Sequence, residues 1–106
     1  MSTSWIYLIA AILFEVSGTT CMKLSEGFTK LVPSVLIFVF YGLCFSFLTL
    51  ALKRLEVSVA YSVWAGLGTV LIAIIGIIWF RESATFIKVL SIALIIMGVI
   101  GINASE

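Results

Sequence analysis

The placement of charged residues constrains this chain more than any other feature of its sequence. Eleven of the 106 residues are Asp, Glu, Lys or Arg, and all but Glu15 lie in or beside the gaps between long apolar stretches or at the C-terminus. Each stretch has about 18 to 24 residues, enough for a helix rising about 1.5 Å per residue to cross roughly 30 Å of hydrocarbon. The pattern therefore predicts four membrane-spanning helices, at residues 5–22, 32–52, 57–80 and 84–103.

The composition indicates a protein whose surface faces lipid. Hydrophobic residues make up 63% of the chain and charged residues 10%, with a mean hydropathy of +1.33. Soluble domains are nearer half apolar and a quarter charged, so a soluble enzyme is excluded. A net charge of +1 without a basic block gives nucleic acid no binding surface. We expect an all-α integral membrane protein, with residues 1–106 forming a single domain.

The sequence offers no metal or disulfide site. It has no His, and its two cysteines, Cys21 and Cys44, lie 23 residues apart in apolar surroundings. We therefore expect two small buried thiols and no metal, cofactor or disulfide. The first residues carry no Lys or Arg and the apolar run after them has no convincing cleavage site, so we expect no removed signal peptide.

The connections set the orientation of the helices. They are short and polar, so consecutive helices are antiparallel, and an even number of spans places both termini on one side of the membrane. Lys53 and Arg54 share that side, whereas the opposite side has Lys23, Lys30, Arg81 and Lys88. The count is therefore two basic residues on one side and four on the other, or three if Lys88 is counted with its helix. This difference is a weak bias for one orientation of insertion. We hypothesise that the chain inserts in both orientations.

Glu15 lies about ten residues into the first predicted span, close to the bilayer midplane. Placing a charged carboxylate at a helix centre in lipid costs about 2.5 to 3.5 kcal/mol even on lenient scales, so Glu15 must face a protein interior or a wet cavity. Loss of water favours its neutral, protonated form, whereas an organic cation beside it favours the charged form. A proton and a cation would then compete for one carboxylate, which couples their transport.

A structural role for Glu15 is the alternative. The carboxyl group could hydrogen-bond Ser17, Thr19 or Thr20 and hold helices together. The sequence has no Lys or Arg at matching depth to neutralise it. Because ionisable groups inside the membrane usually mark functional sites, we favour a binding role.

Small residues lie on the same helix face as Glu15, three or four residues away from it along the chain. They include Ala11, Gly18 and Thr19. Side chains this small allow a ligand to approach the carboxyl group. They also suit close helix packing, and both interpretations can hold on different sides of the face.

Two aromatic stripes accompany the carboxyl group. Tyr61 and Trp64 lie three residues apart in the third predicted span, and Tyr41 and Phe45 lie four apart in the second. Ring faces attract cations with about 0.5 to 2 kcal/mol, so rings around a carboxylate would suit lipophilic cations of varied size. Each ring alone is equally compatible with packing. We expect the Tyr61 hydroxyl and the Trp64 indole N–H to pair with Glu15, since polar atoms in hydrocarbon need partners.

Glycines in the last two spans suggest a bend and a helix contact. Gly66 and Gly68 permit the third span to bend, and Ser91, Gly98 and Gly101 form a small-residue seam on the fourth. Transporters commonly gain access to both sides of the membrane from two inverted halves, and this chain has one. An antiparallel pair of copies would supply the second half.

Five segments together carry a family resemblance: Ile12-Leu-Phe-Glu15-Val-Ser-Gly18-Thr-Thr20, Met22-Lys-Leu-Ser-Glu-Gly-Phe-Thr-Lys30, Pro33-Ser34, Ala60-Tyr61-Ser-Val-Trp64-Ala-Gly66-Leu-Gly68 and Leu94-Ile-Ile-Met-Gly98-Val99. The sequence resembles the small multidrug resistance family of bacterial proton-coupled exporters over essentially the whole chain. The resemblance implies an antiparallel, dual-topology homodimer in the bacterial inner membrane. It also implies exchange of protons for quaternary ammonium and other aromatic cations, without any other cofactor.

The resemblance assigns roles to individual residues. Glu15 would bind either a proton or the substrate, with Trp64 and Tyr61 in contact with substrate and Tyr41 and Phe45 lining the pocket. It places Trp5 at the edge of the pocket, a hinge at Gly66 to Gly68, and the dimer contact at Ser91, Leu94, Ile95, Gly98 and Val99. Guanidinium exporters of the family carry Trp where this chain has Gly18, which favours the multidrug branch.

Three alternatives stay open at this stage. The chain could be a guanidinium exporter of the same family, it could pair with a different chain of that family, or it could be a structural membrane subunit that transports nothing. An intramembrane enzyme lacks support, because the chain has no His and no nucleophile spaced to meet a base.

The weak charge bias predicts that C-terminal reporters are active on both sides of the membrane. Fusions to one reporter that functions only in the cytoplasm and to another that functions only outside it should both give signal. Signal from a single side would refute insertion in both orientations.

Overall fold

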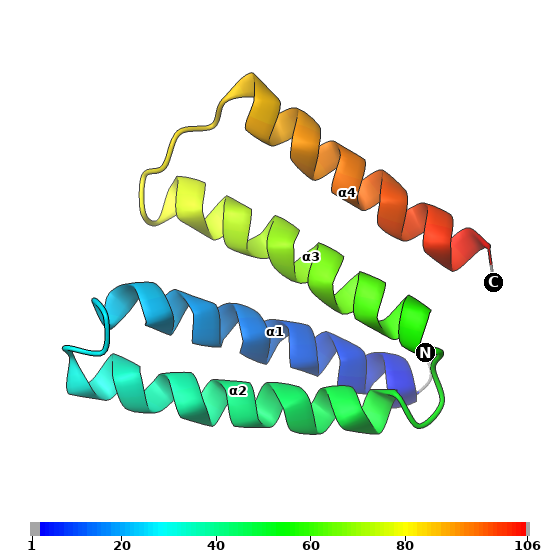
Figure 1. The fold of residues 1–106 in the computed structure, drawn as a ribbon, viewed down its shortest axis with the longest axis horizontal. Helices are drawn as coiled ribbons and strands as arrows, with labels where there is room; N and C mark the ends of the chain where they lie inside the picture. Colours follow the sequence, from blue (N-terminus) through cyan, green and yellow to red (C-terminus); the bar gives the residue numbers. More distant parts are fainter. Residues whose placement is uncertain (1–2, 106) are drawn as a thin grey trace.

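The computed structural model describes residues 3–105, which form four α-helices: α1 (Thr3–Leu24), α2 (Leu31–Ala51), α3 (Val57–Ile78) and α4 (Phe86–Ala104) (Figure 1). Each helix has 19 to 22 residues and is apolar enough to cross a membrane. Consecutive helices run antiparallel, and α1 begins at the same end of the molecule as α4 finishes (Figure 1). The predicted all-α fold with four membrane spans is confirmed.

The helix ends differ from the predicted bounds by up to two residues, most clearly between the last two helices. α3 ends at Ile78 rather than at residue 80, and α4 begins at Phe86 rather than at residue 84. Arg81 takes a left-handed backbone conformation with φ 57°, which a continuing right-handed helix excludes. Thr85 then caps α4, because its side-chain oxygen accepts the backbone N–H of Lys88 at 3.1 Å.

The connection between α1 and α2 is a tight turn. Glu26, Gly27 and Phe28 all have positive φ, which is favourable only for the glycine. The Ser25 hydroxyl accepts the backbone N–H of Phe28 at 3.2 Å and stabilises the turn. α2 follows at Leu31, so Pro33 falls in its first turn as the sequence predicts.

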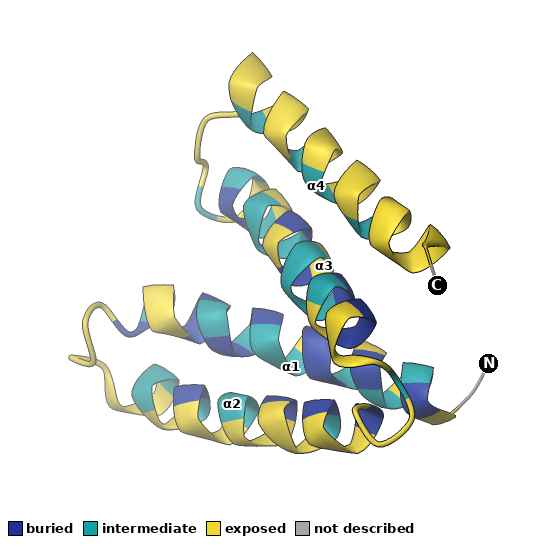
Figure 2. Ribbon diagram, turned by 45° about the vertical axis from the view of Figure 1, so that its right-hand side comes forward, coloured by how far each residue is buried: buried dark blue, intermediate teal, exposed yellow. Residues whose placement is uncertain are grey.

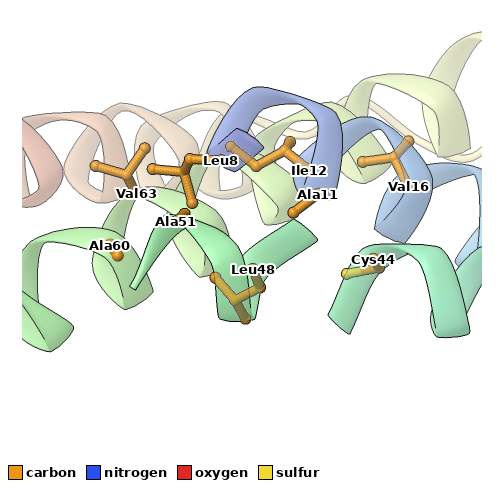
Figure 3. Packing of buried hydrophobic residues seen from close by; sticks show 9 residues of the cluster. All are labelled: Leu8, Ala11, Ile12, Val16, Cys44, Leu48, Ala51, Ala60 and Val63. Carbon is orange, nitrogen blue, oxygen red and sulfur yellow. The ribbon is translucent and has the colours of Figure 1, made fainter. Parts of the chain in front are cut away.

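The core lies where α1 crosses α2 and α3. Figure 3 shows its nine side chains: Leu8, Ala11, Ile12 and Val16 of α1, Cys44, Leu48 and Ala51 of α2, and Ala60 and Val63 of α3. The three alanines are fully buried, and side chains this small let the helix backbones approach closely. Both cysteines are free and buried, as predicted.

α4 stands apart from this core. It packs chiefly against α3 and has no buried residue, and its outer surface is exposed along its whole length (Figure 2). The molecule measures 43 × 35 × 19 Å, so its shortest dimension is about two helix diameters. A single copy is therefore a thin slab of helices rather than a closed bundle.

Candidate functional site

The Glu15 carboxyl group lies between α1 and α3 at the middle of the molecule. Glu15 is the thirteenth of 22 residues in α1, within about 3 Å of the helix midpoint along its axis. Its carboxyl group occupies the space that Gly68 of α3 leaves: a Cβ atom at that position would lie 2.7 Å from Glu15 Oε2. Gly68 therefore sets how closely the carboxyl group can approach α3.

One carboxyl oxygen is held by a hydrogen-bond chain and the other is free. The Thr19 hydroxyl, one turn further along α1, donates to Glu15 Oε1 at 3.3 Å and also hydrogen-bonds the hydroxyl of Tyr41 on α2. Glu15 Oε2 is buried and has no hydrogen-bond partner among residues 3–105. The oxygen that lacks a partner is the one beside Gly68.

The predicted pairing of Glu15 with Tyr61 and Trp64 is not present in this structure. The Trp64 indole nitrogen is buried without a hydrogen-bond partner in the described part of the chain, and the Tyr61 side chain is 57% exposed. For Tyr61 the physical reason is distance along the helix. Gly68 is the α3 residue that meets Glu15, and Tyr61 lies seven residues before it, about 10 Å along the axis.

Aromatic rings form a continuous row that begins at Tyr41, within the hydrogen-bond chain from the carboxyl group. The centroids of Tyr41 and Phe45 are 5.9 Å apart, those of Phe45 and Trp64 6.2 Å, and those of Trp64 and Tyr61 5.3 Å. The row contains rings from α2 and from α3, and these rings are the two aromatic stripes identified in the sequence. Phe45 is 51% exposed, so the row is covered on one side by the protein and open on the other.

Gly18 positions the first ring of this row. A Cβ atom at residue 18 would lie 2.6 Å from two carbons of the Tyr41 ring, so that ring occupies the space a larger side chain would take. Gly18 is buried, as is expected of a contact that brings α1 and α2 together. The Tyr41 hydroxyl can reach Thr19 because residue 18 has no side chain.

The structure places two predicted site residues away from the carboxyl group. Ala11 is fully buried in the core and lines no opening in the single copy. Trp5 lies ten residues before Glu15, about 15 Å along α1, where it lines a small cavity with Arg54, Glu56 and Asn103. In one copy, Trp5 does not approach Glu15.

A cavity of about 280 Å³ between α1 and α3 ends at the hydrogen-bond chain. Its lining comprises Thr19, Thr20, Lys23, Ile72, Ala73, Gly76, Phe80 and Glu82. Sequence analysis did not identify Glu82 as part of a site. Its backbone N–H donates to the Gly76 carbonyl, and its carboxyl group folds against the space beside Gly76. In the sequence, Gly76 is the feature that could have indicated this contact, because only a residue without a side chain leaves room for the Glu82 carboxyl group.

Residues predicted for the hinge and residues predicted for the dimer contact touch each other within one copy. The Val99 side chain of α4 packs directly on Gly66 of α3, with Ile95 beside it, so part of the predicted dimer contact is used within one copy. Ser91, Leu94 and Gly98 remain exposed. α3 runs as one helix through Gly66 and Gly68, so the structure shows no break at the predicted hinge.

The fold and site together define a class of membrane protein. One carboxyl group lies at mid-depth in a molecule of four apolar helices, and hydroxyl groups rather than basic residues contact it. This arrangement is typical of membrane proteins that handle cations.

Comparison with known sequences identifies the family within this class. The Small Multidrug Resistance protein family matches residues 3–95, and the chain belongs to that family. Its members are membrane transporters and not enzymes, so the chain is a multi-pass transporter of the bacterial inner membrane.

Curated relatives span the chain. The Uncharacterized membrane protein YvaE of Bacillus subtilis (strain 168) is 55% identical over 103 residues, which cover 97% of this chain and 87% of the relative. The Quaternary ammonium compound-resistance protein QacG of a Staphylococcus species (strain ST94) is 44% identical over 99 residues, 93% of this chain and 92% of the relative. The Multidrug resistance protein EbrA of Bacillus licheniformis is 40% identical over 105 residues, 99% of this chain and the whole relative.

The contact between Glu15 and Gly68 predicts unequal effects of two glycine substitutions. Gly68→Ala places a methyl group against the carboxyl group, so this variant should be less stable than Gly42→Ala by about 1–3 kcal/mol. Gly42→Ala is the matched control, because nothing lies within 4 Å of its added methyl group. Gly42→Ala should be neutral or stabilising by up to about 1 kcal/mol. Reversible unfolding of the two variants in mixed micelles measures both effects, and equal stabilities would contradict the placement of the carboxyl group.

Proposed function

We propose that the protein is a proton-coupled antiporter that exports quaternary ammonium and other lipophilic or aromatic cations. The observation that carries the proposal is the buried Glu15 Oε2, which has no hydrogen-bond partner among the described residues and lies close to a row of aromatic rings. A carboxyl group in this position is stable when a proton neutralises it or when a cation lies beside it. It cannot hold both, and this exclusion is the coupling step.

The aromatic row explains how a cation without N–H groups is bound. Quaternary ammonium and phosphonium ions cannot donate hydrogen bonds, so they are recognised by carboxylate charge and by the faces of rings. Phe45, Trp64 and Tyr61 offer such faces on the open side of the row. Ring faces impose little directional restriction, which accommodates substrates of different shape. Thr19 and Tyr41 hold the carboxyl group in place as the occupant changes.

A second copy would complete the site. One copy is a thin slab that leaves Phe45 and Tyr61 half-exposed, and a half-exposed site cannot exclude water or lipid from a bound cation. In an antiparallel homodimer, a second copy would cover this side and supply the inverted half that access from both sides requires. The exposed α4 residues Ser91, Leu94 and Gly98 suit the helix contact between the copies. A related chain with the same surface could replace the second copy.

Substrate class is supported by the relatives and by Gly18. The names of QacG and EbrA refer to quaternary ammonium and multidrug resistance. Guanidinium exporters of the family carry Trp at the position of Gly18, and the Tyr41 ring fills that space in this chain. The local packing therefore favours lipophilic cations over guanidinium.

The cavity between α1 and α3 is the route we propose from one membrane face to the carboxyl group. Lys23 and Glu82 lie near the helix ends, and Thr19 lies at the inner end, where it hydrogen-bonds Glu15. In the antiparallel dimer, the corresponding cavity of the second copy would open to the opposite face. Alternating use of the two cavities would move substrate in one direction and protons in the other.

Competition at Glu15 predicts that cation binding releases protons. Titrating purified protein with tetraphenylphosphonium in weakly buffered detergent should acidify the solution, and the dissociation constant should rise as pH falls, because protonated Glu15 does not attract the cation. Glu15→Gln should abolish both binding and proton release. Glu26→Gln is the matched control, since Glu26 is an exposed loop residue, and it should behave like the wild type.

Three results would contradict the proposal. Binding by Glu15→Gln that retains its pH dependence would remove Glu15 from the mechanism. Proton release by guanidinium but not by tetraphenylphosphonium would indicate the guanidinium branch. Absence of proton release and of solute flux in liposomes would indicate a structural subunit.

A further inference from the structure

A second polar cavity lies at the opposite end of the molecule from the α1–α2 turn. It has a volume of about 560 Å³ and is found where α1 begins and α2 turns into α3. We call it the basic corner, and its lining comprises Thr3, Ser4, Tyr7, Leu50, Lys53, Arg54 and Leu55. None of these residues takes part in the cation site described above.

Within residues 3–105, no acidic side chain forms an ion pair with either cation of the basic corner. Among residues 3–105 the ion pair that forms joins Lys30 and Glu26, at the other end of the molecule. Glu56, the acidic residue nearest to Arg54 in the sequence, lines an adjacent cavity with it but does not come within ion-pair distance of Lys53 or Arg54. The basic corner therefore presents two adjacent positive charges to a ligand.

Hydrogen-bond donors complete the lining. Ser4 is only 6% exposed, lines the cavity, and makes no side-chain hydrogen bond to any described residue. Thr3 and Tyr7 add two further hydroxyl groups. Thr3 and Ser4 also form the first turn of the 22-residue helix α1, whose dipole places partial positive charge at this end. Two cations, three hydroxyl groups and a helix N-terminus match the chemistry of a phosphate group.

The depth of the cavity identifies the source of that phosphate. Helices of 19 to 22 residues are about 30 Å long, so their ends lie where lipid headgroups begin. Leu50 and Leu55 line the same cavity and provide an apolar surface on which an acyl chain can lie. A soluble phosphate would make no use of these leucines, whereas a phospholipid would contact both parts of the lining.

We propose that the basic corner binds the headgroup phosphate of an anionic phospholipid. Lys53 and Arg54 contact the phosphate, Ser4 donates a hydrogen bond to it, and Leu50 and Leu55 contact the upper part of an acyl chain. This site is independent of the proposed transport reaction, since binding of lipid here needs neither Glu15 nor a substrate.

Lipid retention by the purified protein tests the proposal. Wild-type protein in dodecylmaltoside micelles is titrated with dioleoylphosphatidylglycerol or dioleoylphosphatidylcholine, and bound lipid is counted by native mass spectrometry. Each basic side chain near an anionic surface contributes roughly fivefold in affinity, so the wild type should prefer phosphatidylglycerol by about thirtyfold. The double variant Lys53→Gln/Arg54→Gln should lose this preference.

Two further variants separate the site from general electrostatics. Lys30→Gln/Arg81→Gln removes the same charge from the other end of the molecule and should keep the preference. Ser4→Ala changes no charge and should weaken phosphatidylglycerol binding by about tenfold, because it removes a hydrogen bond to a charged group. Unchanged tetraphenylphosphonium binding by all three variants shows that they are folded.

The proposal is overturned if Lys53→Gln/Arg54→Gln keeps the preference, or if both double variants lose it equally. It is also overturned as a lipid site if glycerol phosphate displaces phosphatidylglycerol at a comparable concentration, because the corner would then hold a free phosphate. Retention of the lipid against excess glycerol phosphate, together with loss in the first double variant and in Ser4→Ala, supports it.

Discussion

A carboxyl group at the centre of a membrane helix is tolerated only where protein surrounds it, and the positions of several other residues follow from this requirement. Gly68 leaves room for one oxygen, Thr19 donates to the other, and the Tyr41 hydroxyl continues the hydrogen-bond chain onto α2. Gly18 in turn leaves room for the Tyr41 ring. Two glycines and two hydroxyl groups thus accommodate Glu15 without a neutralising Lys or Arg.

The molecule is thin, so a single copy encloses the residues around this site only in part. A core that includes three fully buried alanines joins α1, α2 and α3, while α4 contributes no buried residue. Apolar side chains exposed on a membrane protein are stable in lipid, so exposure alone does not require a partner. The aromatic row is different, because Phe45 and Tyr61 are half-exposed in a row of rings that begins at Tyr41, within the hydrogen-bond chain from Glu15. The proposed antiparallel dimer follows from this incomplete enclosure and from the need for two routes to one site.

Charge placement was sufficient to predict the four spans and the depth of Glu15, since each depends only on distance along the chain. The contacts of Glu15 were predictable only in part. Thr19, one turn from Glu15 on the same helix, was among the hydrogen-bond partners that the sequence suggested. The contacts of Glu15 with other helices depend on helix rotation, which hydropathy does not fix because every face of these helices is apolar. For the same reason sequence analysis missed that Ile95 and Val99 pack on α3, and that Glu82 folds back against Gly76.

The central claim is that a proton and a cation alternately occupy Glu15, and its most direct test observes that carboxyl group itself. Infrared difference spectra of the protein in lipid, compared with those of Glu15→Gln, report whether the carboxyl is protonated as pH changes. The account predicts a protonated carboxyl band in mildly acidic solution that disappears when tetraphenylphosphonium is added at constant pH. A carboxylate that is ionised throughout this pH range, or a band that the cation leaves unchanged, would contradict it.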